Sequence, residues 1–213
     1  MPGKLQLYYI TDRTQIKSSS LEACIERAIE AGVDWVQIRE KDLPARSLLT
    51  ITQAAAGYAR QRHQGRTRVM VNDRLDVALA ATAHGVHLGT RSMPAGAVRR
   101  VVPREFLIGV SCHSLKEALA AQAAGADYLL LGPVFETPSK LPYGPPLGIA
   151  RLREVTAQVK VPVFALGGMT AERVGICLEN GAAGIAGIRI FQDCASVQEL
   201  VRDLHARAEE QKS

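Results

Sequence analysis

The chain has 213 residues, of which 47% are hydrophobic, 22% charged and 5% aromatic. This mixture excludes a disordered chain, a collagen-like repeat and a disulfide-stapled scaffold, and it supports one domain over residues 1–213. No apolar run approaches the roughly 20 residues that cross a bilayer, and the polar start lacks a signal-peptide core. We therefore expect a soluble, cytoplasmic protein without a membrane partner.

The formal net charge is +5, with basic residues densest at 60–68 and 99–104. No basic stretch is interleaved with the aromatic residues that a nucleic-acid stacking surface needs. We expect no nucleic-acid partner and interpret the charge as a solvated surface, with anionic small molecules as the functional alternative.

Four cysteines, Cys24, Cys112, Cys177 and Cys194, are too far apart for a C-x-x-C motif. No Cys/His cluster has zinc spacing, so reduced thiols are expected.

Eight short apolar runs alternate with helical patterns along the chain. They cover residues 5–11, 34–40, 68–72, 85–89, 106–111, 127–133, 161–167 and 184–190. Several are apolar almost throughout, which is typical of parallel strands covered on both faces. Their starts recur every 17 to 34 residues, the rhythm of a βα unit, and predict a single (β/α)₈ TIM barrel. A doubly wound sheet would instead show a G-x-G-x-x-G turn after the first strand.

Helical spacing fills the intervals, for example over 20–32, 46–62 and 114–126. Ser20 and Ser114 are expected to cap two of these helices. Glycines that are expected to end helices are Gly32, Gly125 and Gly181.

In a TIM barrel the chemistry belongs at the carboxyl ends of the strands. The second strand ends in Gln37, Arg39 and Lys41, which share one face because side chains alternate along a strand. Two cations directed into a barrel mouth predict an anionic ligand, since unpaired buried charge is costly. The alternative is that nearby acids, Glu40, Asp42 or Asp73, hold them in ion pairs.

The third and fourth strands contribute Asn72, Asp73 and His87. Asn72 could orient a ligand, and Asp73 could hold Mg²⁺, pair with Lys41, or cap a helix beginning near Leu75. His87 is equally consistent with a core histidine and a catalytic one.

The fifth strand runs into Ser111, Cys112 and His113. A histidine at this position suits acid–base chemistry near neutral pH. A Cys112–His113 nucleophilic pair is disfavoured, because neighbouring strand residues point to opposite faces.

Glycine-bearing turns follow the seventh and eighth strands, at Gly167–Gly168 and at 187–189. Such turns present backbone N–H groups to a phosphate, so we expect a phosphate site there. The long connection after the sixth strand carries Thr137, Ser139 and Lys140, and hydroxyls with a lysine on a loop suit an anionic ligand.

Taken in order, these segments resemble the thiamine phosphate synthase superfamily. The motifs are Q-x-R-x-K at 37–41, VNDR at 71–74, GVHLG at 85–89, GVSxHS at 109–114, GPVFxTxxK at 132–140 and ALGGMT at 165–170. The resemblance implies one of two activities. A synthase joins a pyrimidine diphosphate to thiazole phosphate with Mg²⁺, whereas a tautomerase aromatises the carboxylated thiazole phosphate without a metal.

The resemblance also implies roles for individual residues. For a synthase, the pyrimidine diphosphate would be bound by Gln37, Arg39, Lys41, Asn72, Ser111 and Lys140, with Asp73 as a Mg²⁺ ligand. The thiazole phosphate would be held by Thr137, Ser139, Gly167, Gly168, Ile188 and Arg189.

Two positions depart from the synthase pattern. Ser92 stands where a synthase usually has a second metal-binding Asp, and Arg189 replaces a small residue after the eighth strand. Losing a carboxylate weakens a Mg²⁺ site, and Arg91 adds positive charge beside it.

The first hypothesis is therefore a thiazole tautomerase acting on a phosphorylated thiazole without a cofactor. His113 would move the proton, and Lys41, with Arg39, would face the substrate carboxylate. The alternatives are a Mg²⁺-dependent thiamine phosphate synthase and a non-catalytic binder of thiazole or thiamine phosphates. The sequence leaves a homo-oligomer open.

Overall fold

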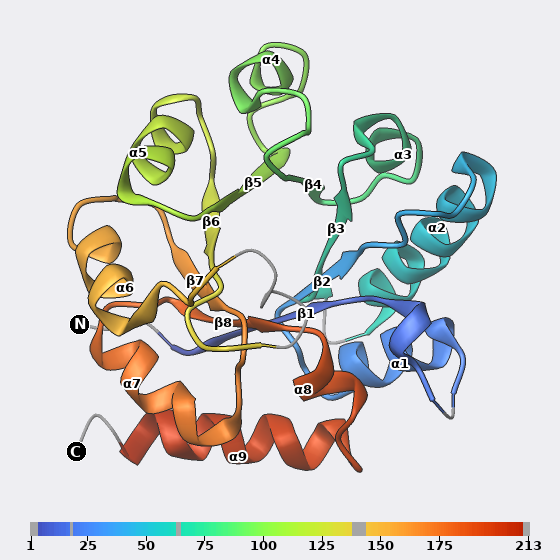
Figure 1. Cartoon of the computed structure of the whole chain (residues 1–213). Helices are drawn as coiled ribbons and strands as arrows, with labels where there is room; N and C mark the ends of the chain where they lie inside the picture. Colours follow the sequence, from blue (N-terminus) through green and yellow to red (C-terminus); the bar gives the residue numbers. More distant parts are fainter. Residues whose placement is uncertain (1–3, 18, 63–64, 138–143, 211–213) are drawn as a thin grey trace.

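The computed structural model describes residues 4–17, 19–62, 65–137 and 144–210. Eight parallel strands close into a barrel in which each strand pairs with its neighbours in chain order and β8 pairs with β1 (Figure 1). The strands are β1 (Gln6–Ile10), β2 (Trp35–Ile38), β3 (Arg68–Asn72), β4 (Gly85–Leu88), β5 (Leu107–Cys112), β6 (Tyr128–Leu131), β7 (Val163–Leu166) and β8 (Gly184–Gly187). The predicted (β/α)₈ barrel is confirmed.

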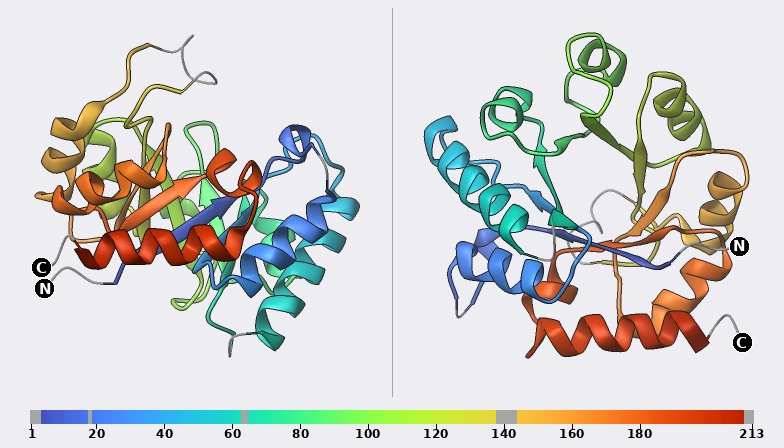
Figure 2. Two further views of the ribbon diagram at one scale, coloured as in Figure 1. Left: turned by 90° about the horizontal axis from the view of Figure 1, so that it is seen from below. Right: turned by 180° about the vertical axis from the view of Figure 1, so that it is seen from behind.

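Helices form an outer layer around the strands, as both views in Figure 2 show. They are α1 (Leu21–Glu30), α2 (Ala45–Gln61), α3 (Leu75–Ala80), α4 (Ala95–Arg99), α5 (Leu115–Ala123), α6 (Gly148–Thr156), α7 (Val174–Glu179), α8 (Arg189–Gln192) and α9 (Val197–Glu210), with 3₁₀ turns at Arg13–Gln15 and Ala171–Arg173. Across the described ranges, none of these helices combines the length and apolar character of a membrane span.

The predicted helix caps at Ser20 and Ser114 are both present. The Ser20 hydroxyl accepts a hydrogen bond from the Ala23 N–H at 3.1 Å, and the Ser114 hydroxyl accepts one from the Glu117 N–H at 3.2 Å. Each bond satisfies an N–H group that has no partner inside the helix.

The predicted strand 184–190 is too long. Strand β8 ends at Gly187, and Arg189 is the first residue of α8. The apolar run continues past the turn because Ile190 packs against the hydrophobic core from the helix, so hydrophobicity alone does not mark the end of the strand.

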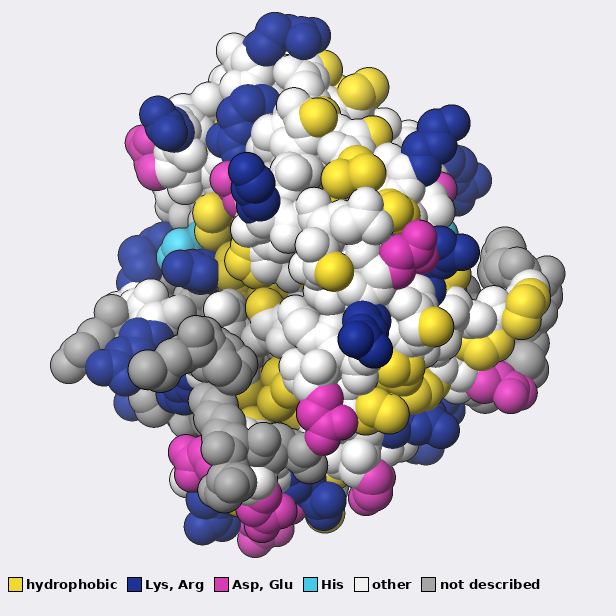
Figure 3. Space-filling model, turned by 90° about the vertical axis from the view of Figure 1, so that its left-hand side faces the viewer, with side chains coloured by type: hydrophobic (Ala, Val, Ile, Leu, Met, Phe, Trp, Pro, Cys, Tyr) yellow, Lys and Arg dark blue, Asp and Glu magenta, His cyan; other side chains and the backbone are white. Residues whose placement is uncertain are grey.

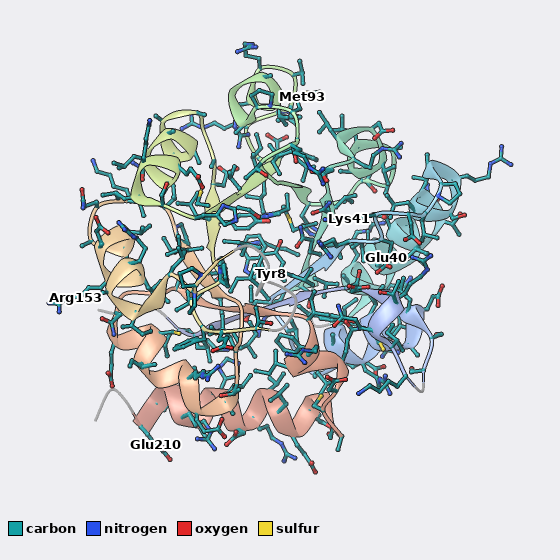
Figure 4. All side chains as sticks on the ribbon, viewed as in Figure 1. Tyr8, Glu40, Lys41, Met93, Arg153 and Glu210 are labelled. Carbon is teal, nitrogen blue, oxygen red and sulfur yellow. The ribbon has the colours of Figure 1, made fainter. Side chains whose placement is uncertain are left out.

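Aromatic side chains fill the barrel interior. Tyr8, Trp35, Tyr128 and Phe164 pack with ring centroids 4.9 to 5.8 Å apart. Gly109 makes room for them, because a Cβ at this position would lie 2.0 Å from the Tyr128 ring. Figure 4 places Tyr8 at the centre of the barrel. This packed floor confines any ligand to the mouth at the carboxyl ends of the strands.

Charges of both signs are interspersed on the face shown in Figure 3, where lysines and arginines lie among acidic and neutral side chains. This face therefore has no continuous field of one sign.

Candidate active site

A row of hydrogen-bonded polar side chains crosses the carboxyl ends of β2, β3 and β4. The Gln37 amide donates to Asn72 Oδ1 at 3.3 Å, and the Asn72 amide donates to Asp73 Oδ2 at 2.8 Å. The Ser92 hydroxyl donates to the other carboxylate oxygen of Asp73 and accepts from the Gly89 N–H at 2.6 Å. We call Gln37, Asn72, Asp73 and Ser92 the polar row.

The polar row has one buried acceptor that has no partner among the described residues. Gln37 is only 1% exposed, and its Oε1 atom has no hydrogen-bond partner among the described residues. A buried acceptor without a donor costs about 1–3 kcal/mol. It therefore marks a position where a ligand N–H would be stabilised.

The backbone at Asp73 holds its carboxylate in this row. Its φ of +61° lies in the left-handed region, where aspartate is better tolerated than most residues. Its N–H donates to the His87 carbonyl at 2.9 Å. The interpretation of Asp73 as a helix cap is wrong, because Arg74 occupies the cap position of α3 without a side-chain bond.

Of the three acids proposed as alternative partners for Arg39 and Lys41, Glu40 and Asp42 are bound to Arg13, whereas Asp73 is bonded to Asn72 and Ser92. The Arg13 guanidinium contacts Glu40 at 3.3 Å and holds Asp42 through two bonds of 2.5 and 2.7 Å. Glu40 is buried and also accepts a 2.6 Å bond from Thr11. Glu40 therefore bonds to Thr11 and Arg13, whereas Gln37 bonds to Asn72. The strand β2 ends at Ile38, so the predicted strand 34–40 is too long at this end.

Arg39 lies half-buried beyond Gln37, with its N–H donating to Thr11 Oγ1 at 2.9 Å. Within the described part of the chain its guanidinium forms no ion pair. Lys41 is exposed and lies inside the ring of helices near the ends of β2 and β3 (Figure 4). Both cations are therefore at the mouth, where a ligand anion could reach them.

His87 is a buried, neutral member of a second polar chain. Its Nε2 lies 2.8 Å from Ser111 Oγ and its Nδ1 lies 3.3 Å from the Tyr128 hydroxyl. Burial lowers the pKa of His87 to about 3; Asp73 opposes this shift, and Arg39 adds to it. At neutral pH this ring carries no charge.

His113 follows the end of β5 and is exposed. Its Nδ1 lies 3.2 Å from Glu117 Oε2, and the same carboxylate accepts a 2.7 Å bond from the His113 N–H. Cys112 is buried, and burial raises the pKa of its thiol to about 12. The thiol is thus protonated near pH 7, which agrees with rejection of a Cys–His nucleophile.

The turn after β7 is tightly built. Gly167 and Gly168 have φ values of +95° and +63°, and a Cβ on Gly168 would lie 2.5 Å from the Glu136 carbonyl oxygen. Arg173 donates to the Gly168 carbonyl and lies over the Phe135 ring at 4.6 Å. The loop after β6 is thereby fastened to the turn after β7.

After the end of β8, Ile188 precedes the single-turn helix α8, and the Arg189 side chain is exposed. Thr137 is half-buried in the loop after β6. Ser139 and Lys140 lie outside the described residues. The glycine turn and the polar row therefore open at the same end of the barrel, with β1 between β8 and β2.

Mg²⁺ usually binds one or two protein carboxylates together with substrate phosphate oxygens and water. Asp73 supplies one carboxylate at the mouth, which is the smallest number of protein carboxylates that such a Mg²⁺ site uses. Among the described residues there is no group of three acidic, histidine or cysteine side chains that could hold a metal by themselves. The donor set fits a metal that is brought by, or shared with, a phosphorylated ligand.

Sequence reasoning missed two groups near the site. Tyr8 and Tyr128 lie within apolar runs, so their sequence pattern predicts core residues. In the structure the Tyr8 hydroxyl is hydrogen-bonded to the Tyr128 hydroxyl, which is hydrogen-bonded to His87. Arg13 pairs with acids 27 and 29 positions away, a separation that leaves no local pattern.

The sequence and the fold of this chain are similar to those of known proteins. The family model described as thiamine monophosphate synthase matches residues 7–191. A thiamine-phosphate synthase of Methanoculleus marisnigri is 41% identical over 94% of each chain, and one of Clostridium novyi is 39% identical over 86% of this chain and 88% of its own. The solved thiamine phosphate pyrophosphorylase of Pyrococcus furiosus superposes with a TM-score of 0.86 at 34% identity, covering 98% of both chains. The chain belongs to the thiamine monophosphate synthase family and is an enzyme of thiamine biosynthesis.

Proposed function

We propose that this enzyme joins a pyrimidine diphosphate to a thiazole phosphate to form thiamine phosphate. The bond between the pyrimidine methylene carbon and the diphosphate oxygen breaks, and the thiazole nitrogen forms a new bond to that carbon. Diphosphate leaves with the electron pair, so the step needs no oxidant or reductant.

One observation supports this proposal: two polar regions lie at the same end of the barrel. The polar row with Arg39 lies at the ends of β2 to β4, the glycine turn Gly167–Gly168 follows β7, and Gly187 ends β8. Two regions suit two phosphorylated substrates held side by side, an arrangement that converts their reaction into an effectively unimolecular step. The names of the relatives point to the same reaction.

Each region has a distinct task. Arg39 and Lys41 stabilise the negative charge that grows on the departing diphosphate, helped by Ser111 and Lys140. Gln37 and Asn72 orient the pyrimidine, whose N–H groups suit the unused Gln37 acceptor. Thr137, Ser139, Gly167, Gly168, Ile188 and Arg189 hold the thiazole phosphate.

Asp73 would hold Mg²⁺ together with diphosphate oxygens. When bound, the ion neutralises charge on the leaving group.

A thiazole tautomerase is the second candidate, and Ser92 favours it. Its hydroxyl, rather than a second carboxylate, contacts Asp73. In this reaction His113 removes a proton from the carboxythiazole and returns one elsewhere on the molecule. Arg39 and Lys41 then face the substrate carboxylate, and no metal takes part.

Purified enzyme supplied with each substrate set distinguishes these reactions. One assay gives pyrimidine diphosphate and aromatic thiazole phosphate and follows thiamine phosphate, with and without excess EDTA. The other gives the non-aromatic carboxythiazole tautomer and follows its aromatisation in wild-type and His113→Asn enzyme. Aromatisation that survives EDTA and is lost in His113→Asn, without thiamine phosphate formation, would establish the tautomerase. Binding without turnover in either assay would indicate a non-catalytic binder.

A further inference from the structure

Four side chains from four strands form a hydrogen-bonded chain through the barrel interior. Tyr8 of β1 lies 2.7 Å from the Tyr128 hydroxyl of β6, which lies 3.3 Å from His87 Nδ1 of β4. His87 Nε2 continues the chain to Ser111 of β5 at 2.8 Å. Tyr8, Tyr128 and His87 are at most 2% exposed, whereas Ser111 is half-buried at the mouth end.

The direction of the protons follows from the buried end of the chain. Among the described residues, the Tyr8 hydroxyl has the Tyr128 hydroxyl as its one hydrogen-bond partner. A buried O–H without an acceptor costs about 1–3 kcal/mol, so Tyr8 donates to Tyr128. The Tyr128 oxygen then accepts the hydrogen bond from Tyr8. The Tyr128 hydroxyl must therefore donate its own single proton to His87 Nδ1.

A neutral imidazole carries one proton, so an accepting Nδ1 places that proton on Nε2. The His87 side chain is buried, and among the described residues its ring nitrogens contact only hydroxyl groups, so no carboxylate stabilises a charged ring. The Nε2–H group therefore donates to Ser111 Oγ. The proton of Ser111 is unused by this chain, and that hydroxyl has no other hydrogen bond within the described ranges.

The reverse order is disfavoured. If Ser111 donated to Nε2, then Nδ1–H would donate to Tyr128 and Tyr128 to Tyr8. The Tyr8 proton would then point into the packed aromatic interior without a described acceptor.

We propose that Tyr8 and Tyr128 fix His87 in its Nε2–H form, so that Ser111 offers its own proton to an oxygen of the bound diphosphate. His87 and Tyr128 are positioning residues, since they act through Ser111. The proton order stands on the structure alone, and only the identity of the acceptor rests on the proposed function.

The proton order is tested by ¹⁵N NMR of the full chain labelled at its five histidines, with His87 assigned from a His87→Gln variant. The expected result is a neutral ring protonated at Nε2 throughout pH 6–8. Protonation at Nδ1 would overturn the proposal.

Two matched tyrosine variants sharpen this test, because each removes one buried hydroxyl. In Tyr128→Phe the His87 Nδ1 resonance should move to the position of a free lone pair. In Tyr8→Phe it should stay near the wild-type position, because Tyr128 still donates to Nδ1. Equal shifts in both variants, or a shift in Tyr8→Phe alone, would contradict the assigned direction.

The role of Ser111 is tested by titrating inorganic diphosphate into the enzyme. Ser111→Ala should weaken binding about tenfold, as expected for loss of a hydrogen bond to a charged group. His87→Leu should do the same, His87→Gln should restore binding through its amide N–H, and the Ser111→Ala/His87→Leu pair should be no weaker than Ser111→Ala. Additive losses would overturn the positioning role. If wild-type enzyme shows the Nε2–H form yet does not bind diphosphate, the acceptor and the proposed function fail while the proton order stands.

Discussion

The Ser92 hydroxyl contacts the Asp73 carboxylate at the point where β3 and β4 open into the barrel mouth. The Gly89 N–H holds the same hydroxyl in place. Asp73 is thus oriented by neutral donors from Asn72 and Ser92 rather than facing a second carboxylate. Under the proposed function, this arrangement sets how strongly the site would bind Mg²⁺.

Replacing Ser92 by aspartate should strengthen Mg²⁺ binding. A second carboxylate completes the usual protein contribution to a Mg²⁺ site, so the Mg²⁺ concentration for half-maximal synthase rate should fall by about tenfold. Without metal the two carboxylates repel, so Mg²⁺ should also raise the Tm of Ser92→Asp more than that of wild type. Ser92→Ala is the control, since it removes the hydroxyl without adding charge. An unchanged response to Mg²⁺ in Ser92→Asp would show that no metal binds at Asp73.

Arg39→Ala should weaken substrate binding without unfolding the barrel. Its guanidinium makes no ion pair with a described residue, so the folded state loses little. Loss of a charged contact to diphosphate corresponds to a rise in KM of about 10- to 100-fold. The matched control is Arg46→Ala, an exposed arginine of α2, which should leave KM unchanged. A large fall in the Tm of Arg39→Ala would mean that Arg39 is structural.

Gly168→Ala should destabilise the turn after β7. The alanine would adopt a φ of +63° and place its Cβ 2.5 Å from the Glu136 carbonyl oxygen. Together these effects should cost about 2–3 kcal/mol, which lowers Tm by roughly 5–10 °C in a chain of this size. Calorimetry measures this directly.

The comparison variant is Gly57→Ala in α2, where an added Cβ meets nothing within 4 Å. It should raise stability by about 0.5–1 kcal/mol, because alanine favours the helix. If both variants had the same Tm, the tight approach at Gly168 would be refuted.

His87 should make the fold sensitive to acid. The unfolded chain takes up a proton at His87 near the ordinary pKa of 6.5, whereas burial delays this in the folded state to about pH 3. The contribution of the neutral, buried His87 to the free energy of unfolding is therefore fully present above pH 6.5 and is lost as the pH falls toward 3. Urea unfolding should show that wild type loses about 2–3 kcal/mol more than His87→Gln between pH 7 and 4.5. Parallel losses in the two proteins would exclude a buried neutral His87.

The barrel was predictable because its signals are local and repeated. Each strand is a short apolar run, and Ser20 and Ser114 cap the helices that follow two of them. These features depend on neighbours a few residues apart, which a sequence displays directly.

Contacts between distant residues were not predictable in the same way. Arg13 forms ion pairs with Glu40 and Asp42, although the sequence pattern suggested these acids as partners of Arg39 and Lys41. Tyr8 and Tyr128 are 120 positions apart, and their shared hydrogen bond exists only after the barrel closes. The end of β8 was missed because Ile190 is apolar for packing in α8 rather than in a strand.

The most direct measurement is the rate of thiamine phosphate formation by purified enzyme from the pyrimidine diphosphate and aromatic thiazole phosphate. We expect product to form with Mg²⁺, to fall to background with excess EDTA, and to return when Mg²⁺ is restored. Absence of product under all three conditions, together with EDTA-resistant aromatisation of the carboxythiazole tautomer, would contradict the synthase assignment and establish the tautomerase in its place.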